Sequence, residues 1–497
     1  MEADEHQRRV IESRARTIRL VAPAGSGKTG TIVGRVLRRI QEGVPAERIL
    51  LLTFDRSAAA SVAARLARAA AGGPAPRVST LNAFGYRLLR ERVPAEHAPV
   101  APAETCLELA AEGIEALARA SPARRAALPE WIDAGAALGL HALLKNALLD
   151  PHELDPDRLT RLLLSSRPAA AYLPLDRGRG TVEAAIEAIA WLYRAYEEGM
   201  RRIGRLDFDD QKLRACAALA SSPRLAREVA GAYDEVIVDE FQDVNRLDFE
   251  LVRAIARRAR LVVAGDDDQA IYGFRGCTSE FIVDLERRLD RAVASHELAI
   301  NYRSPPEVLA HAERLIRRNP GRIPKRPVAS RTDAAEIVRL VHPDGESEAA
   351  AVAEWVRRAV ESAGGRWGEV AILVRLHAQA PPFREALRAR GVPVRVEVPA
   401  VPGDAPEDRE STDGEGRDAV EIRTYFKAKG SQWPTVVLVG CHEGVIPHER
   451  SLVEDERRLF YVGITRAGKR LVVSSVAPGS GRVRPSRFLA EAGLDGE

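Results

Sequence analysis

The sequence is poor in cysteine and lacks long apolar runs, and each absence excludes a class of protein. Its four cysteines lie far apart and form no Cys-x-x-Cys pair, so a zinc site, an iron–sulfur cluster and a disulfide framework find no support. No apolar run approaches the roughly 18 residues that a transmembrane helix needs. The charged residues 1–9 do not resemble a signal peptide. We therefore expect a soluble, cytoplasmic protein with no membrane partner.

Lysine is also scarce, with seven residues against 67 arginines, although the formal net charge is only +3. A nearly neutral balance argues neither for nor against a nucleic-acid partner. A lysine inside a motif is informative here, because its compact ammonium differs chemically from the planar guanidinium of arginine. The 497 residues are too many for one ordinary core, so we expect two or more domains.

Apolar strands alternate with helical patterns in two stretches of the chain, which is typical of an α/β fold with parallel sheets flanked by helices. The first set of predicted strands is 18–21, 49–53, 236–238 and 261–264. The second set is 336–341, 370–374, 420–424, 436–439 and 470–474. Two separate sets of strands predict two lobes.

Two segments depart from this alternation. Between residues 90 and 205 strands are absent, and helical patterns at 109–119, 138–149 and 182–202 predict a helical insertion in the first lobe. Residues 397–418 contain eight acids, two arginines, three prolines and three glycines, with almost no large apolar residue. This composition predicts an acidic, flexible linker.

Residues 22–29 (APAGSGKT) are expected to form a phosphate-binding loop between an apolar strand and a helix. Backbone N–H groups at the start of such a helix favour a phosphate. Gly25 and Gly27 permit the tight turn, Lys28 can reach the β- and γ-phosphates, and the Thr29 hydroxyl can ligate Mg²⁺. The alternative is an ordinary glycine-rich turn. The predicted nucleotide-binding residues of the loop are Ala24, Gly25, Ser26, Gly27, Lys28 and Thr29.

A second motif, DEFQD at residues 239–243, follows an apolar run that reads as a buried strand. Such a strand would deliver the Asp239 carboxylate to Mg²⁺ and the Glu240 carboxylate to an attacking water. Gln242 and Asp243 restrict which type of ATP-driven motor the motif indicates. The alternative is that they serve only to cap the next helix. With the loop at Lys28, these residues predict ATP hydrolysis with ATP and Mg²⁺ as cofactors.

Further motifs follow in a fixed order: GDDDQ at 265–269, IYGFRG at 271–276, NYRS at 301–304, TYFKAKGSQW at 424–433 and ERRLFYVGITRA at 456–467. Together these segments resemble superfamily 1 DNA helicases of the UvrD/Rep/PcrA type. The resemblance implies two RecA-like P-loop NTPase lobes with a helical insertion in the first. Its parts would be lobe 1A (1–89 and 206–288), insertion 1B (90–205), lobe 2A (289–396 and 419–497), and the linker 397–418 in place of subdomain 2B.

The resemblance also implies how both lobes build the ATP site. Gln7 stands where the family reads adenine, and Tyr302 where it stacks on adenine. Gln432 occupies the place of a glutamate that holds the ribose, so we expect altered sugar discrimination. The implied catalytic residues are Asp239, Glu240, Gln269 as γ-phosphate sensor, and the arginine fingers Arg303 and Arg466. Fingers on the lobe opposite Lys28 would make hydrolysis depend on lobe closure. For Arg303, an ordinary surface ion pair is the alternative.

The implied DNA contacts are Thr53, Phe54, Thr80, Phe274, Arg275, Lys427 and Lys429. Phe54 and Phe274 would offer ring faces to bases of any sequence, worth roughly 1–3 kcal/mol each. Core packing is the alternative for both rings, and solvated surface charge is the alternative for the two lysines. The chain departs from the family pattern at Leu81-Asn82, usually Phe-His, and at Phe426, usually His.

The expected function is an ATP-dependent motor on single-stranded DNA and single/double-strand junctions, translocating 3′ to 5′ as the resembling family does. The alternative is a DNA-stimulated ATPase subunit that unwinds poorly alone and works in a repair or phage-defence complex. The sequence contains no nuclease motif, so a partner protein would supply any cutting. An inactive homologue is disfavoured because every hydrolytic position is filled.

Overall fold

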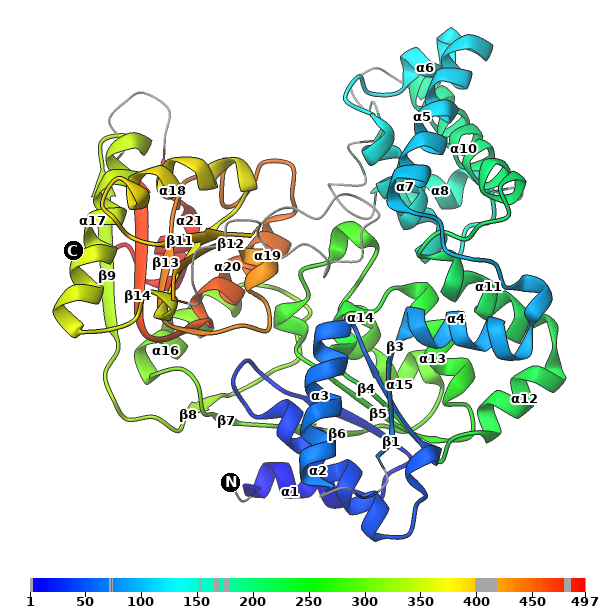
Figure 1. Cartoon of the computed structure of the whole chain (residues 1–497), viewed down its shortest axis with the longest axis horizontal. Helices are drawn as coiled ribbons and strands as arrows, with labels where there is room; N and C mark the ends of the chain where they lie inside the picture. The colour runs from blue at the N-terminus through cyan, green and yellow to red at the C-terminus, as the bar shows by residue number, and fades with distance from the viewer. Residues whose placement is uncertain are drawn as a thin grey trace.

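Two parallel six-stranded sheets, one in each lobe, form the framework of the protein (Figure 1). The structure, a computed structural model, describes residues 3–70, 73, 75–151, 154–164, 170, 172–173, 179–397, 418–477 and 484–496. The first sheet has the order β3-β2-β4-β5-β1-β6. Its strands are β1 (Thr17–Val21), β2 (Ile49–Thr53), β3 (Arg77–Thr80), β4 (Glu235–Val238), β5 (Arg260–Gly265) and β6 (Ala294–Glu297).

The second sheet has the order β11-β12-β10-β13-β14-β9. Its strands are β9 (Glu336–His342), β10 (Val370–Val374), β11 (Val394–Val396), β12 (Val420–Thr424), β13 (Trp433–Leu438) and β14 (Ala467–Val476). A small sheet of β7 (Ile300–Asn301) and β8 (Val328–Ala329) lies between β6 of the first sheet and β9 of the second in sequence. The predicted α/β class is confirmed.

Three strands of the large sheets, β3, β6 and β11, escaped the sequence analysis, and all three are edge strands. Central parallel strands are buried on both faces and therefore read as unbroken apolar runs. An edge strand such as β6, with the sequence ASHE, carries no such run because none of its residues is fully buried. The predicted strand 436–439 also begins earlier, at Trp433.

Helices cover both faces of each sheet. In the first lobe they are α1 (Glu5–Glu12), α2 (Lys28–Gln41), α3 (Arg56–Ala69), α4 (Leu81–Arg92), α11 (Asp210–Ser221), α12 (Pro223–Gly231), α13 (Arg246–Ile255), α14 (Glu280–Val283) and α15 (Leu285–Leu289). In the second lobe they are α16 (Pro306–Ile316), α17 (Gly345–Ala363), α18 (Ala380–Arg388), α19 (Tyr425–Ala428), α20 (Val453–Ile464) and α21 (Arg487–Ala492).

The helices between the two halves of the first lobe form a bundle with a core of its own, drawn in cyan and green at the upper right of Figure 1. They are α5 (Ala103–Ala120), α6 (Pro122–Ala127), α7 (Ala134–Asn146), α8 (Pro156–Leu164) and α10 (Arg179–Arg202). Helix α4 runs to Arg92 and buries Leu88 and Leu89 in the first-lobe core, so the bundle begins after it. The predicted helix 138–149 ends earlier, at Asn146, and Leu148 takes a positive φ of 56°.

Buried ionic contacts attach this bundle to the first lobe. The Lys145 ammonium, at the end of α7, lies 2.6 Å from an Asp207 oxygen and 2.7 Å from an Asp210 oxygen at the start of α11. It also lies 2.6 Å from Glu197 on α10. The three carboxylates are close enough to suggest a metal site, but the lysine ammonium already lies among them. The cluster is therefore a structural anchor.

Most of the predicted acidic linker, residues 398–417, lies outside the described residues. The strands on either side of it, β11 and β12, pair directly in parallel, with Val394 opposite Val420. Across the portion of the chain that is described, no helix has both the length and the apolar character needed to cross a membrane.

Candidate nucleotide site and nucleic-acid face

The loop between β1 and α2 has the geometry of a phosphate cradle. Gly25 and Gly27 have φ values of 78° and 83°, a region that favours glycine. A Cβ atom at Gly25 would lie 2.6 Å from the Arg303 Cβ, so the close approach of the second lobe also excludes a side chain there. Thr29 follows Lys28 in the first turn of α2 and is half-buried.

Residues of the second lobe donate hydrogen bonds to backbone carbonyls of this loop. The Asn301 side-chain amide donates to the Ala24 carbonyl at 2.7 Å, and the Tyr302 N–H donates to the Gly25 carbonyl at 2.9 Å. The Asn301 side-chain oxygen accepts from the N–H groups of Arg303 and Ser304. Asn301 lies within the NYRS motif, but the sequence indicates no role for it, because nothing local to it reveals a partner 277 residues away.

Lys28 bridges the two acids of the second motif. Its Nζ lies 2.8 Å from Asp239 Oδ1 and also contacts Glu240. Burial opposes the charge of Glu240, but the Lys28 and Lys429 ammonium groups lower its pKa to about 2. Burial raises the pKa of Asp239, and the neighbouring Glu240 carboxylate acts in the same direction while Lys28 opposes both. On the first-lobe side, the Lys28 ammonium thus has two carboxylate partners.

Glu240 is held in a set orientation. It adopts a positive φ of 53°, uncommon for a residue with a side chain, and its N–H donates to Asp239 Oδ1 at 2.9 Å. The Gln242 side-chain amide donates to Glu240 Oε2 at 2.5 Å, and its oxygen accepts from the Asp266 N–H at 3.1 Å. Gln242 does not cap the next helix, α13, whose N-cap is Asn245; it links the carboxylate of Glu240 to the end of β5.

The two predicted arginine fingers lie at the interface and contact neutral oxygens. Arg466 Nη2 donates to Gln269 Oε1 at 3.0 Å, and Gln269 Nε2 donates to Asp266 Oδ2 at 2.6 Å. Arg303 Nε donates to Gln432 Oε1 at 2.6 Å. Burial, together with repulsion from Arg303, lowers the pKa of Arg466 to about 9. Within the described parts of the chain, neither guanidinium forms an ion pair with a carboxylate.

The predicted adenine-binding residues gather beside the same loop. Gln7 is buried, and its amide donates to the Ser26 carbonyl at 3.5 Å. The Tyr302 hydroxyl donates to Asp4 Oδ2 at 2.6 Å. A Cβ atom at Gly27 would lie 2.6 Å from Gln7 Nε2 and 3.9 Å from a ring carbon of Tyr302, so all three residues share one side of the loop.

Aromatic rings from both lobes form a cluster near the interface. Phe54 stacks on Tyr272, with centroids 5.1 Å apart and planes at 19°. Phe274 meets the Phe426 ring edge-on at 5.5 Å and 86°. The Arg275 guanidinium lies 5.7 Å from the Phe54 centroid. Phe274 is 49% exposed, which excludes core packing for this ring, whereas Phe54 is half-buried.

Three of the residues predicted to contact DNA have hydrogen-bond partners within the protein. Thr53 is buried, and its hydroxyl donates to the Asp55 carbonyl at 3.0 Å. Thr80 caps α4 by accepting from an N–H group of the first turn. The Lys429 ammonium is buried against Asp243 and donates to the Gln269 carbonyl at 2.8 Å. In this structure the Lys429 ammonium is thus paired within the protein, and its phosphate contact stays a prediction. Lys427 stays partly exposed, 3.5 Å from Glu397.

Comparison with known families matches nearly the whole chain. A model described as the UvrD/REP helicase N-terminal domain matches residues 3–290, and one described as the UvrD-like helicase C-terminal domain matches 296–398 and 405–477. The chain belongs to the UvrD/REP helicase family. This confirms the resemblance inferred from the motifs.

Individual members of the family are similar along most of the chain. The ATP-dependent DNA helicase UvrD2 of Mycobacterium tuberculosis is 29% identical over 591 aligned positions, covering 98% of this chain and 81% of that protein. UvrD1 of the same organism is 29% identical, covering 78% of this chain and 49% of UvrD1. PcrA of Leuconostoc citreum is 26% identical, covering 78% of this chain and 48% of PcrA.

A buried lysine that lies outside the quoted motifs belongs to the same interface. The ammonium of Lys325, between α16 and β8, lies within 2.7 Å of oxygens of Asp266, Asp267 and Asp268. Arg322 donates to Asp268 from the same segment. These contacts fasten the second lobe to the loop that carries Gln269. Only the scarcity of lysine could have pointed to Lys325 in the sequence.

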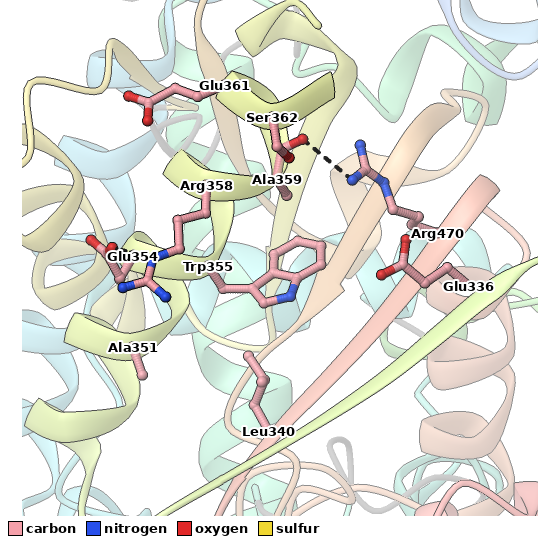
Figure 2. A pocket seen from close by; sticks show the side chains of 10 residues that line it. All are labelled: Glu336, Leu340, Ala351, Glu354, Trp355, Arg358, Ala359, Glu361, Ser362 and Arg470. Carbon is pink, nitrogen blue, oxygen red and sulfur yellow. Dashed lines mark hydrogen bonds and ion pairs between the residues drawn. The ribbon is translucent and has the colours of Figure 1, made fainter. Parts of the chain in front are cut away.

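One surface pocket of the UvrD/REP-type chain lies on the second lobe, away from these groups (Figure 2). It is lined by α17, β9 and β14, with the Trp355 ring beside Arg470. Arg470 donates to the Ala359 carbonyl at 3.4 Å, and Arg358 pairs with Glu354. None of the residues drawn belongs to the nucleotide site or the aromatic cluster, so this pocket gives no indication of the activity.

Proposed function

We propose that this chain is an ATP-dependent DNA motor that hydrolyses ATP between its lobes and steps along single-stranded DNA from 3′ to 5′. The observation that carries the proposal is the placement of Arg303 and Arg466. Both reach the interface from the second lobe, beside the loop of Lys28, and both lack a carboxylate partner among the described residues. The guanidiniums of buried Arg466 and half-buried Arg303, without a carboxylate partner among the described residues and beside a phosphate cradle, suit the γ-phosphate of a nucleotide.

Each first-lobe residue has a task that its chemistry fits. Asp239 and Thr29 offer the hard oxygen ligands that Mg²⁺ prefers, and a bound Mg²⁺ would neutralise phosphate charge. Lys28 leaves its two carboxylates to hold the β- and γ-phosphates. Glu240, oriented by Gln242, accepts the proton of the attacking water.

The second lobe supplies the positive charge that stabilises the transition state of phosphoryl transfer. Phosphoryl transfer needs charge stabilisation more than covalent chemistry, and an arginine finger typically contributes about 10³- to 10⁵-fold in rate. Arg303 and Arg466 belong to the second lobe and Lys28 to the first. Hydrolysis therefore depends on lobe closure. One closure and reopening per ATP is one step along the strand.

The aromatic cluster is proposed as the track for the DNA bases. Phe274 is the most exposed of its rings, and Phe54 lies beside Arg275. Stacking on such faces is tolerant of sequence because every base has a π-face. Lys427 is proposed as a phosphate contact at the same face. The helical bundle 1B would border the path of the strand.

The domain plan is proposed to lack subdomain 2B. Strands β11 and β12 pair directly, and 398–417 is too short and too polar a segment for a packed domain. The alignment with UvrD2 spans 591 positions against 497 residues here, which supports a missing insertion. We therefore expect translocation on single strands but weak unwinding of duplex unless a partner protein assists. This expectation favours the alternative of a subunit in a larger complex.

ATPase assays of the purified chain, with and without single-stranded DNA, test the proposal. Wild type should be stimulated by DNA, whereas Lys28→Ala should lose ATP turnover and keep most of its DNA binding, because the lysine faces nucleotide phosphates. Equal loss of both activities in a folded Lys28→Ala variant would contradict separate sites. Duplexes with a 3′ or a 5′ tail then report polarity and the strength of unwinding.

A further inference from the structure

We propose that Gln432 is a positioning residue that holds the guanidinium of Arg303 until a nucleotide phosphate takes it. The inference rests on the proposed ATP hydrolysis at the lobe interface and assigns Gln432 a task other than binding the sugar. Its basis is the turn of residues 430–432, between α19 and β13, which accepts hydrogen bonds from both predicted arginine fingers.

The contacts of this turn are specific. Arg303 Nε donates to Gln432 Oε1 at 2.6 Å, and Arg466 Nη1 donates to the Ser431 carbonyl at 3.3 Å. The Trp433 N–H donates back to the Arg466 carbonyl at 3.1 Å, which fixes the turn against the arginine. This turn therefore contacts both guanidiniums: it holds Arg303 through Gln432, whereas Arg466 is also held by Val462, Thr465 and Gln269.

The backbone of Arg303 is hydrogen-bonded on both sides, whereas its guanidinium contacts neutral oxygens. Its N–H donates to Asn301 Oδ1 at 2.9 Å, and its carbonyl accepts from Arg331 at 3.0 Å. Apart from Gln432, the guanidinium has one further hydrogen-bond partner in the part of the chain that the structure describes, the Thr465 carbonyl at 3.5 Å. Only the side chain of Arg303 needs to turn for the guanidinium to change partner.

The neutrality of Gln432 decides how easily this exchange occurs. An amide oxygen accepts a charge-assisted hydrogen bond but brings no opposite charge, so a phosphate with several negative oxygens outcompetes it. A carboxylate at position 432 would instead form an ion pair with Arg303 and compete with the phosphate. The side chain of Gln432 is exposed, so substitutions there leave the lobe core intact.

The test compares Gln432→Glu with wild type in ATP turnover, each measured with ATP and with dATP. We expect kcat to fall about fivefold with both nucleotides, as about 1 kcal/mol for a partly exposed ion pair implies, with little change in KM. Gln41→Glu, which adds the same charge at an exposed position at the far end of α2, serves as the matched control and should match wild type. In an Arg303→Ala background, single-turnover hydrolysis should be indifferent to Gln432→Glu.

Two results would contradict the inference. An unchanged kcat with an altered preference between ATP and dATP would assign Gln432 to the ribose and overturn the inference. A Gln432→Glu effect that persists without Arg303 would also overturn it. These failures differ from failure of the proposed function, in which wild type itself would not hydrolyse ATP.

Discussion

The two sides of the nucleotide site differ in how their charges are balanced before any nucleotide binds. On the first lobe, Lys28 lies between Asp239 and Glu240, so the cation has two anionic partners. On the second lobe, the oxygens that Arg303 and Arg466 contact among the described residues are all amide, hydroxyl or carbonyl oxygens. The cation of the first lobe already has carboxylate partners. The second lobe carries an excess of positive charge, which a phosphate would neutralise.

This difference separates two steps of the proposed cycle. A nucleotide binding to the first lobe must displace the carboxylates from Lys28, and its phosphates and Mg²⁺ replace both charges. The arginines gain a partner only when the lobes bring them to the γ-phosphate. Binding is therefore assigned mainly to the first lobe, and hydrolysis to both.

Arg303→Ala tests the second side and should have the largest effect. Loss of an arginine finger is expected to lower kcat about 10³- to 10⁵-fold, with smaller change in ATP affinity. The measurement is single-turnover hydrolysis with DNA present. Arg317→Ala, an exposed arginine of the second lobe paired with Glu313, is the control and should match wild type. A tenfold loss or less would place Arg303 outside the transition state.

Glu240→Gln tests the first side and should have the next largest effect. Asp239 still offers its carboxylate to Mg²⁺, so Mg-ATP binding should persist, while loss of the base slows hydrolysis about 10²- to 10⁴-fold. ATP retention and phosphate release are measured on one sample. Glu91→Gln, at an exposed position of α4, controls for the charge change. Near-normal turnover would remove Glu240 from catalysis.

Phe274→Ala should have the smallest effect of the three substitutions, and the effect should be limited to DNA binding. Loss of one stacking face is expected to weaken single-stranded DNA binding by roughly 1–3 kcal/mol, similarly for all base sequences. ATP affinity without DNA should not change. Trp131→Ala, another exposed aromatic residue but in the helical bundle, provides the comparison. If both variants weaken DNA binding equally, the aromatic cluster is not the base track.

The sequence was most informative where one local segment contains the whole signal. The central strands were predicted because burial on both faces produces unbroken apolar runs such as VIV at 236–238. The glycines of the phosphate loop were predicted because its turn needs positive φ values. Edge strands such as β3 and β6 lack such runs and were missed.

Pairings between distant residues were the main failure. The pairing of Lys429 with Asp243 was not predicted, because the two residues lie 186 positions apart and no local pattern connects them. Phe426 was noted only as a departure from the family motif, yet it packs against Phe274 across the interface. Lys325 and Asn301 went unassigned for the same reason. Contacts between lobes depend on how the two sheets pack together, which local periodicity does not encode.

The most direct test of the division between the lobes measures Mg-ATP affinity and single-turnover hydrolysis on the same samples of Lys28→Ala and Arg303→Ala. Our account predicts that Lys28→Ala loses ATP binding and hydrolysis together, whereas Arg303→Ala binds ATP and fails to hydrolyse it. Hydrolysis by Arg303→Ala at the wild-type rate, or loss of ATP binding equal to that of Lys28→Ala, would contradict it.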